Sequence, residues 1–228
     1  MRRVLLAAVL LALSFADLTV TVTQAGADPG KIMKGVKFTV TASGWEGSCT
    51  SATIDLSECP VCTLQNEDTV KAISGSSVSW TSVIAMQTAS DQRISVSVSG
   101  CTPQSASSSS FEVVLPPELR VTVSPASFSN PSGTKTLSVT VENVGENTAN
   151  DVIATLSLPG GVTTTDPLSK NLGSIGGGAS KGTSWFLTFT SPSTSTLTIT
   201  VASSNAGIVT KTVPVTVSAP SGGEEGGV

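Results

Sequence analysis

The sequence contains no histidine and no tyrosine. Histidine is the commonest general base and metal ligand, and tyrosine supplies a phenolic acid or nucleophile. Catalysis would therefore depend on carboxylates, lysines or thiols. The acidic residues are scattered, and Glu67, Asp68 and Asp91 stand in polar segments typical of solvated turns. Paired carboxylates must face each other across a substrate to act as acid and base. The sequence thus predicts a non-enzymatic protein without a cofactor.

Charge is also scarce: charged residues make up 12% of the chain, with 12 Lys and Arg against 16 Asp and Glu. Proteins that bind nucleic acid need a positive surface to displace counterions from phosphates. An acidic chain of this kind is not expected to bind nucleic acid. Serine and threonine are abundant and must supply most of its surface polarity.

Long hydrophobic runs are lacking except at the start. Residues 1–16, MRRVLLAAVLLALSFA, combine a basic start, a short apolar run and small residues around Phe15. The run is too short for a bilayer of about 20 helical residues, so it is interpreted as a cleaved signal peptide with Asp17 as the first mature residue. No later segment is predicted to span a membrane, and the protein is expected to be secreted and associated with the cell surface. Loss of Arg2 and Arg3 leaves 12 − 2 = 10 basic against 16 acidic residues, a net charge of −6.

The rest of the chain alternates apolar with hydroxylic residues, as in LTVTVT at 18–23 and LTITVAS at 197–203. Such alternation places one set of side chains in a core and the other in water, which is the pattern of a half-buried strand. Gly, Pro, Asn and Asp clusters separate the runs, and no helical pattern follows the signal. Strands are predicted at 18–24, 35–42, 51–56, 69–73, 78–86, 93–99 and 110–115, and at 119–124, 135–142, 150–158, 168–172, 183–190, 195–203 and 209–218.

Pro116 and Pro117 cannot donate hydrogen bonds to a central strand ladder and mark a boundary between two halves. Each half has roughly 100 residues, the usual size of an immunoglobulin-like sandwich. The predicted fold is all-β, with two tandem antiparallel immunoglobulin-like β-sandwiches. The predicted organisation is a signal peptide at 1–16, a disulfide-containing sandwich at 17–115, a linker at 116–118, a second sandwich at 119–218 and a flexible Gly/Glu tail at 219–228.

The second half carries an Asn-x-Gly turn at 143–145, a Pro-Gly-Gly turn at 159–161 and LGSIGGG at 172–178 before the strand that contains Trp185. In these features residues 119–218 resemble CARDB-type immunoglobulin-like repeats of prokaryotic cell-surface proteins. The glycine run replaces the proline-containing turn of those repeats. The resemblance implies a scaffold and supports function only by association. The first half is similar to the same broad class more loosely.

The four cysteines, at 49, 59, 62 and 101, all lie in the first half. An even number of cysteines behind a signal peptide is typical of disulfides. If 51–56 is a true strand, ten residues of extended chain would place Cys49 and Cys59 about 33 Å apart, well beyond the ~7 Å limit of a disulfide. This favours Cys49–Cys101 and Cys59–Cys62. If the segment folds back, Cys49–Cys59 and Cys62–Cys101 stay possible.

The Cys59-x-x-Cys62 spacing also occurs in redox centres and in half of a zinc site. A redox motif needs a following helix, whereas Cys62 precedes a polar loop, and the second close cysteine pair of a zinc ribbon is lacking. A structural disulfide is therefore the preferred interpretation, with thiol redox activity or metal binding as the alternative.

Few other residues suggest a site. Trp80 and Trp185 lie in alternating strands and are expected in the cores, whereas Trp45 lies in a Gly-flanked loop near Cys49. Trp45 either packs on a disulfide or contacts a sugar or partner. Residues 143–151 supply oxygen ligands that could suit calcium, but they are also ordinary turn formers. Residues 104–110, QSASSSS, could be a flexible loop or carry O-linked sugars.

The sequence therefore predicts a cell-surface structural or adhesion protein that binds other surface proteins or glycans through loops and edge strands. An alternative is a filament subunit whose N-terminal strand, 18–23, adds to the sheet of a neighbour. The preferred interpretation is that this strand pairs within its own domain.

Overall fold

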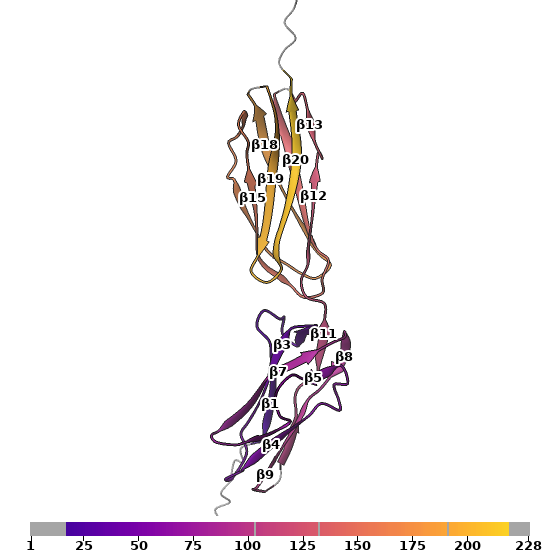
Figure 1. Ribbon diagram of the computed structural model, residues 1–228, viewed down its shortest axis with the longest axis vertical. Helices are drawn as coiled ribbons and strands as arrows, with labels where there is room; N and C mark the ends of the chain where they lie inside the picture. Colours follow the sequence, from indigo (N-terminus) through magenta and orange to yellow (C-terminus); the bar gives the residue numbers. More distant parts are fainter. Residues whose placement is uncertain (1–16, 103, 132, 191, 219–228) are drawn as a thin grey trace, which may run out of the picture. The chain divides into compact units, whose positions relative to one another are not determined.

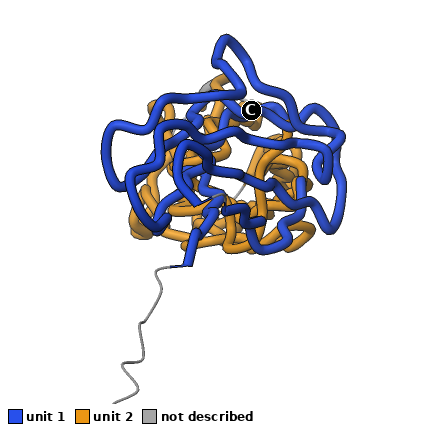
Figure 2. Tube along the Cα trace, turned by 90° about the horizontal axis from the view of Figure 1, so that it is seen from below, with its two compact units in different colours: residues 1–25, 35–113 blue, residues 26–34, 114–228 orange. Residues whose placement is uncertain are grey.

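The computed structural model describes residues 17–102, 104–131, 133–190 and 192–218 and is all-β in this part of the chain (Figure 1). The predicted signal peptide and tail lie outside the described residues. The chain divides into two compact units, and residues 26–34 belong with 114–228 to the second (Figure 2). Each of the fourteen predicted strands is present. The short strands β2, β5, β8, β10, β13 and β16 were not predicted.

The first unit packs a sheet of order β1-β3-β7-β5 against one of order β10-β9-β4-β6, and β8 pairs with β11. All of these pairings are antiparallel. Its strands are β1 (Thr19–Thr23), β3 (Lys37–Ser43), β4 (Ser51–Asp55), β5 (Cys62–Leu64), β6 (Val70–Ala72), β7 (Ser77–Ala85), β8 (Ala89–Gln92), β9 (Ser95–Ser99), β10 (Gln104–Ser107) and β11 (Phe111–Val114).

The second unit packs a sheet of order β12-β14-β18-β16 against one of order β13-β20-β19-β15-β17. Only the short β13–β20 pairing is parallel among those described. The strands are β2 (Lys31–Met33), β12 (Leu119–Ser124), β13 (Phe128–Ser129), β14 (Thr134–Asn143), β15 (Ala149–Ser157), β16 (Val162–Thr164), β17 (Ser169–Ile175), β18 (Ser180–Phe189), β19 (Ser193–Ser203) and β20 (Gly207–Val217).

Period-two alternation builds both cores. In β14, Leu137, Val139 and Val141 are buried while the intervening Ser138 and Thr140 are exposed. Val, Ile and Thr suit this arrangement because their branched Cβ atoms pack well on a pleated surface. The largest core side chains are Trp80 in the first unit and Trp185 in the second, and both are fully buried as predicted.

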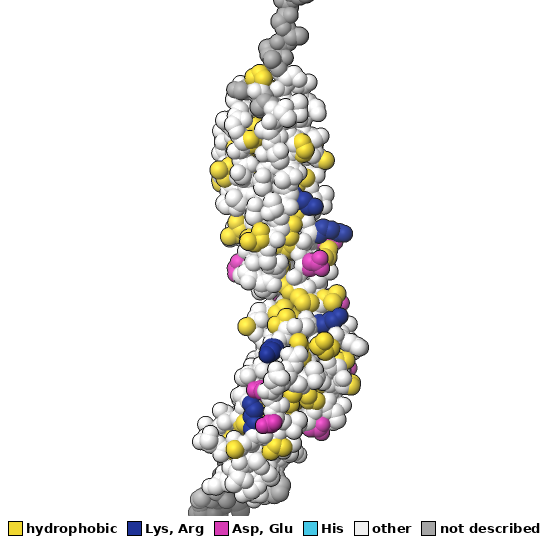
Figure 3. Space-filling view, viewed as in Figure 1, with side chains coloured by type: hydrophobic (Ala, Val, Ile, Leu, Met, Phe, Trp, Pro, Cys, Tyr) yellow, Lys and Arg dark blue, Asp and Glu magenta, His cyan; other side chains and the backbone are white. Residues whose placement is uncertain are grey.

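Hydroxyl groups cover the outward faces of the sheets. On the face shown in Figure 3, most of the surface is neither hydrophobic nor charged. Many of these groups bond across neighbouring strands: Thr155 Oγ1 lies 2.7 Å from Ser169 Oγ, and Thr41 Oγ1 lies 2.8 Å from Ser79 Oγ. Such cross-strand hydroxyl pairs add a few tenths of a kcal/mol up to about 1 kcal/mol each to sheet stability.

The buried Trp80 is held by a cluster that we call the tryptophan clamp. Its indole Nε1 donates to the carbonyl of Asp68 at 3.0 Å, and the Lys71 ammonium lies 5.8 Å from the ring centroid. Lys71 donates to the carbonyl before Trp80 at 2.7 Å and pairs with the Glu67 carboxylate at 3.1 Å. Glu67 in turn accepts the backbone N–H that follows Trp80 at 2.9 Å. Glu67, predicted as a solvated turn residue, is instead a structural acceptor.

The second unit has a clamp of the same design around Trp185. Its Nε1 donates to the carbonyl of Pro167 at 2.8 Å, and the Lys170 ammonium lies 5.2 Å from the ring centroid. Lys170 donates to the carbonyl before Trp185 and lies 3.6 Å from the Asp166 carboxylate. Asp166 accepts the N–H of Phe186 at 2.7 Å. In both units an acid is followed four residues later by lysine, and the carbonyl after the acid accepts the indole N–H.

Asn143 anchors the turn after β14 in the second unit. The side chain is fully buried, and its Nδ2 donates to the carbonyls of Asn147 at 2.8 Å and Ile175 at 3.0 Å. Its Oδ1 accepts the N–H groups of Gly145 and Glu118, both at 3.1 Å. All the hydrogen-bonding capacity of one buried amide is therefore used. A Cβ at Gly145 would collide with the Pro116 backbone, so the Asn-x-Gly turn needs both residues.

We predict that Glu67→Gln destabilises the first unit at neutral pH by about 1–2 kcal/mol, because hydrogen bonds to a charged acceptor are lost. Burial raises the pKa of Glu67, but hydrogen bonds from Ser82, Lys71 and Thr81 and the charge of Lys71 outweigh it and hold this pKa below its ordinary value of 4.5. A lowered folded-state pKa contributes stability above the unfolded-state pKa that is lost as pH falls through the folded-state pKa. The difference between wild type and Glu67→Gln should therefore shrink below about pH 4.5.

Urea unfolding at several pH values measures this difference. Glu112→Gln, a change of an exposed glutamate in the same unit, is the matched control and should stay within about 0.5 kcal/mol of wild type. A gap between wild type and Glu67→Gln that does not change with pH would contradict the role assigned to the ionised carboxylate.

Asn143→Ala should lower the free energy of unfolding of the second unit by about 3 kcal/mol, because it leaves buried donors and acceptors without partners. Thr140→Ala, on the exposed face of the same strand, should change it by less than about 0.5 kcal/mol. Equal effects of the two changes in urea unfolding would show that the Asn143 network is not the anchor of the turn.

Candidate functional site

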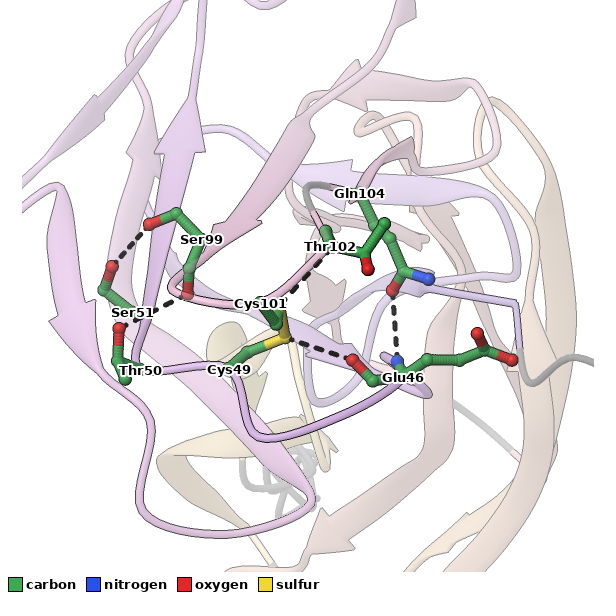
Figure 4. The surroundings of a disulfide bond; sticks show 8 residues. All are labelled: Glu46, Cys49, Thr50, Ser51, Ser99, Cys101, Thr102 and Gln104. Atoms are coloured by element: carbon green, nitrogen blue, oxygen red, sulfur yellow. Dashed lines mark hydrogen bonds between the residues drawn. A yellow bond between two sulfur atoms is a disulfide. The ribbon is translucent and has the colours of Figure 1, made fainter.

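The Cys49–Cys101 disulfide closes one end of the first unit (Figure 4). Strands β4 and β9 are antiparallel with Ser51 opposite Ser99. Two residues before Ser51 and two residues after Ser99, the same register places Cys49 opposite Cys101. Their Cα atoms are 4.6 Å apart, within the range that a disulfide requires. The register of two strands thus explains this pairing.

The Cys59–Cys62 disulfide pins a local turn. The Cα atoms are 5.3 Å apart, and Cys62 N donates to the Cys59 carbonyl at 2.8 Å. Cys62 begins β5 opposite Ala85 of β7. Cys59 has no exposed surface, and its burial separates its sulfur from solvent reagents. The structure therefore has the pairing that the sequence favours if 51–56 is a strand.

Trp45 lies in the loop between β3 and the Cys49–Cys101 disulfide, and it is half-buried. The loop is fixed on both sides: Glu46 N donates to Gln104 Oε1 at 3.2 Å, and a Cβ on Gly44 would lie 2.6 Å from the Asp17 carbonyl (Figure 4). Gly47 has a positive φ of 77°, which favours glycine. These contacts hold the loop, and Trp45 within it is partly exposed.

A shallow depression of about 380 Å³ lies on the outer face of the β4, β9 and β10 sheet. It was not predicted from sequence. Serines line it, with Asp55 as its charged residue. Ser95 Oγ and Ser107 Oγ are 2.7 Å apart within it, and Asp55 Oδ1 accepts the N–H of Ser57, which lowers the pKa of Asp55. Alternation in SVSVS and QSAS predicts only solvated serines at this place.

The oxygen-rich segment 143–151 is used internally by the second unit. Glu146 Oε2 accepts Leu115 N at 2.8 Å, Asn147 Oδ1 accepts Asp28 N at 2.8 Å, and Asn150 Oδ1 accepts the Ser174 hydroxyl at 3.2 Å. These oxygens face different partners and do not converge on one point. Throughout the described ranges, no group of three or more His, Cys, Asp or Glu side chains is arranged to hold a metal ion.

No family model matches the chain, and no curated protein matches it in sequence. Solved structures resemble it in architecture. Fibronectin(III)-like modules of Clostridium thermocellum CbhA share 8% identity over 88% of this chain and 94% of theirs, with a TM-score of 0.41. A Salmonella alpha-2-macroglobulin shares 9% over 90% of this chain and 16% of its own, with a TM-score of 0.38. A Porphyromonas gingivalis protein of unknown function shares 14% over 87% and 99%, with a TM-score of 0.30.

The sheets of the two units by themselves make the chain an all-β protein with sandwich architecture, and membership of the CARDB-type repeats stays a prediction. Within the part of the chain that the structure describes, no helix is long and apolar enough to cross a membrane.

The two disulfides should differ in their contribution to stability. In the chain-entropy model, the 52-residue separation of Cys49 and Cys101 corresponds to about 4 kcal/mol, and the three-residue separation of Cys59 and Cys62 to about 2 kcal/mol. We predict that Cys49→Ser with Cys101→Ser lowers the free energy of unfolding about twice as much as Cys59→Ser with Cys62→Ser. Urea unfolding of both double variants measures this order, and the reverse order would contradict it.

Proposed function

We propose that this chain is a secreted, non-enzymatic cell-surface protein that binds a surface glycan or another surface protein. The carrying observation is the loop end of the first unit, where the Cys49–Cys101 disulfide fixes a loop that presents Trp45. Aromatic faces contact sugars and partner proteins well because they bury a large apolar area with few rotatable bonds. A rigid scaffold lowers the entropy cost of ordering such a loop on binding.

Export is supported by the cysteines. All four are paired in disulfides, and disulfides persist mainly in oxidising environments outside the cytosol. The predicted signal peptide at 1–16 and the resemblance of 119–218 to CARDB-type surface repeats point the same way. In this proposal the second unit is a spacer or accessory module at the cell surface.

The thiol redox and metal-binding alternative has less support. Cys59 is fully buried and bonded to the half-buried Cys62, and among the described residues no helix begins after Cys62 to lower the pKa of a thiol there. Cys101 and Cys49 are joined to each other at the loop end, so the four sulfurs do not form one group.

Fluorescence provides a test, because Trp80 and Trp185 are fully buried and Trp45 is partly exposed. The protein is titrated with polysaccharide and protein fractions from the cell envelope of the organism that makes it. We predict that at least one fraction shifts the fluorescence emission of Trp45 to shorter wavelength. Trp45→Ala should weaken binding of that fraction at least tenfold, or about 1.4 kcal/mol. Phe186→Ala, which removes the ring of a residue that is 54% exposed in the second unit, is the matched control.

Binding of the fraction is followed for both variants by co-sedimentation. Unchanged binding by Phe186→Ala with loss in Trp45→Ala supports the loop end as the site. Equal binding by both variants, or no fraction that binds, would contradict it.

A further inference from the structure

Strand β1 is an edge strand without the usual protection. Natural sheets protect their edges with very short strands, charged side chains, proline or bulges, because an open edge can pair with another chain. β1 has five residues, all Thr or Val, and stands at the end of its sheet beside β3. It carries no charge and no proline, and its pairing with β3 runs from Thr19 to Thr23 without a shift in register.

All but one of the other described edges of the sandwich sheets are protected. β5, β6, β13 and β16 have three residues or fewer. β12 carries Arg120, whose side chain is 64% exposed, and β17 carries Lys170 and pairs with β15 through register shifts. β10 is the nearest comparison, but it has four residues and no β-branched side chain. β1 is therefore the open edge best suited to accept a strand.

The sequence of β1 reads the same in both directions: Thr-Val-Thr-Val-Thr. If two copies of β1 pair antiparallel about a two-fold axis at Thr21, Thr19 of each copy lies opposite Thr23 of the other, and Val20 lies opposite Val22. Directly opposite residues in an antiparallel pair point to the same face. The valines of both copies then meet on the core side, where Val20 is buried, and the threonines meet on the solvent side.

Charge also permits this pairing. The chain is acidic, so its net negative charge works against the association of two copies. In the register centred on Thr21, Asp17 of one copy lies opposite Ala25 of the other, so no like charges face each other along the strand. The neutral edge is thus a place where two copies can approach with little electrostatic cost.

We propose that β1 is a homodimerisation edge, on which β1 of a second copy pairs antiparallel about Thr21. The two β1-β3-β7-β5 sheets then form one continuous sheet. This interface is isologous and closes on itself, so it gives dimers and no polymer. It leaves β1 paired with β3 of its own unit, unlike a filament in which the strand moves to a neighbour. Dimerisation does not depend on ligand binding at Trp45.

Single-cysteine variants test the register. The Cα atoms of directly opposite residues lie about 4.5–5.5 Å apart, which fits the 4.4–6.8 Å range of a disulfide. Thr21→Cys should therefore form an intermolecular disulfide with itself under mild oxidation. Thr19→Cys alone should not, because it lies about four residues, or ~13 Å, from its counterpart. A mixture of Thr19→Cys and Thr23→Cys should cross-link.

Sedimentation equilibrium of the chain without introduced cysteines tests self-association directly. Thr21→Lys places a charge on the edge and should weaken self-association at least tenfold, whereas Thr122→Lys, an exposed position on edge strand β12, should not change it. The proposal is supported if Thr21→Cys cross-links with itself, Thr19→Cys cross-links with Thr23→Cys, and Thr21→Lys dissociates the dimer. A monomer at high concentration, equal cross-linking of all single variants, or open-ended polymers would overturn it.

Discussion

A β-sandwich that buries a tryptophan between its sheets must supply an acceptor for the indole N–H, because an unpaired buried donor costs about 1–3 kcal/mol. Both units meet this constraint in the same way. The strand preceding the tryptophan strand in sequence begins near an acid and a lysine four residues later, Glu67 and Lys71 or Asp166 and Lys170. The acid holds the backbone after the tryptophan, the lysine covers its ring, and the intervening carbonyl accepts the N–H. The packing of the remaining core residues is built around this plug.

The units differ in what else supports them. In the first, the Cys49–Cys101 disulfide extends the β4–β9 ladder beyond its last hydrogen bonds, so a covalent bond fixes the end that carries Trp45. In the second unit, which has no cysteine, a buried amide network around Asn143 and Asn147 fixes the turn after β14. Residues 26–34 take part in it, because Asp28 bonds to Asn147 and to Thr148. Asparagine is effective here because one side chain both donates and accepts.

Alternation predicted the long strands well, since it reports directly which side chains face a core. It could not predict β5 or β16, whose three residues are too few to show a period. The two clamps could not be predicted from the sequence. The acid–lysine spacing is the same in both units, but the distance from the lysine to the tryptophan differs, with nine residues before Trp80 and fifteen before Trp185. Only folding shows that both loops bring the same groups to the ring.

The candidate site was predictable to a similar degree. Strand pairing explains why Cys49 meets Cys101, and the sequence could favour this pair only on the condition that 51–56 forms a strand. The serine-lined depression gave no signal, because Ser95 and Ser107 are distant in sequence and ordinary in strands. The oxygen-rich segment 143–151 looked like a possible calcium loop, yet its side chains satisfy backbone and side-chain donors of the same unit.

The proposed function requires that the chain is exported and that its cysteines are structural. Intact-mass analysis of the secreted protein, with and without reduction, followed by non-reducing peptide mapping, tests this most directly. We expect an N-terminus at Asp17, no free thiol, and linked peptides that join Cys49 to Cys101 and Cys59 to Cys62. Free thiols, bound zinc or a Cys49–Cys59 linkage would contradict the structural role of the cysteines and would favour the Cys59–Cys62 segment as a reactive site.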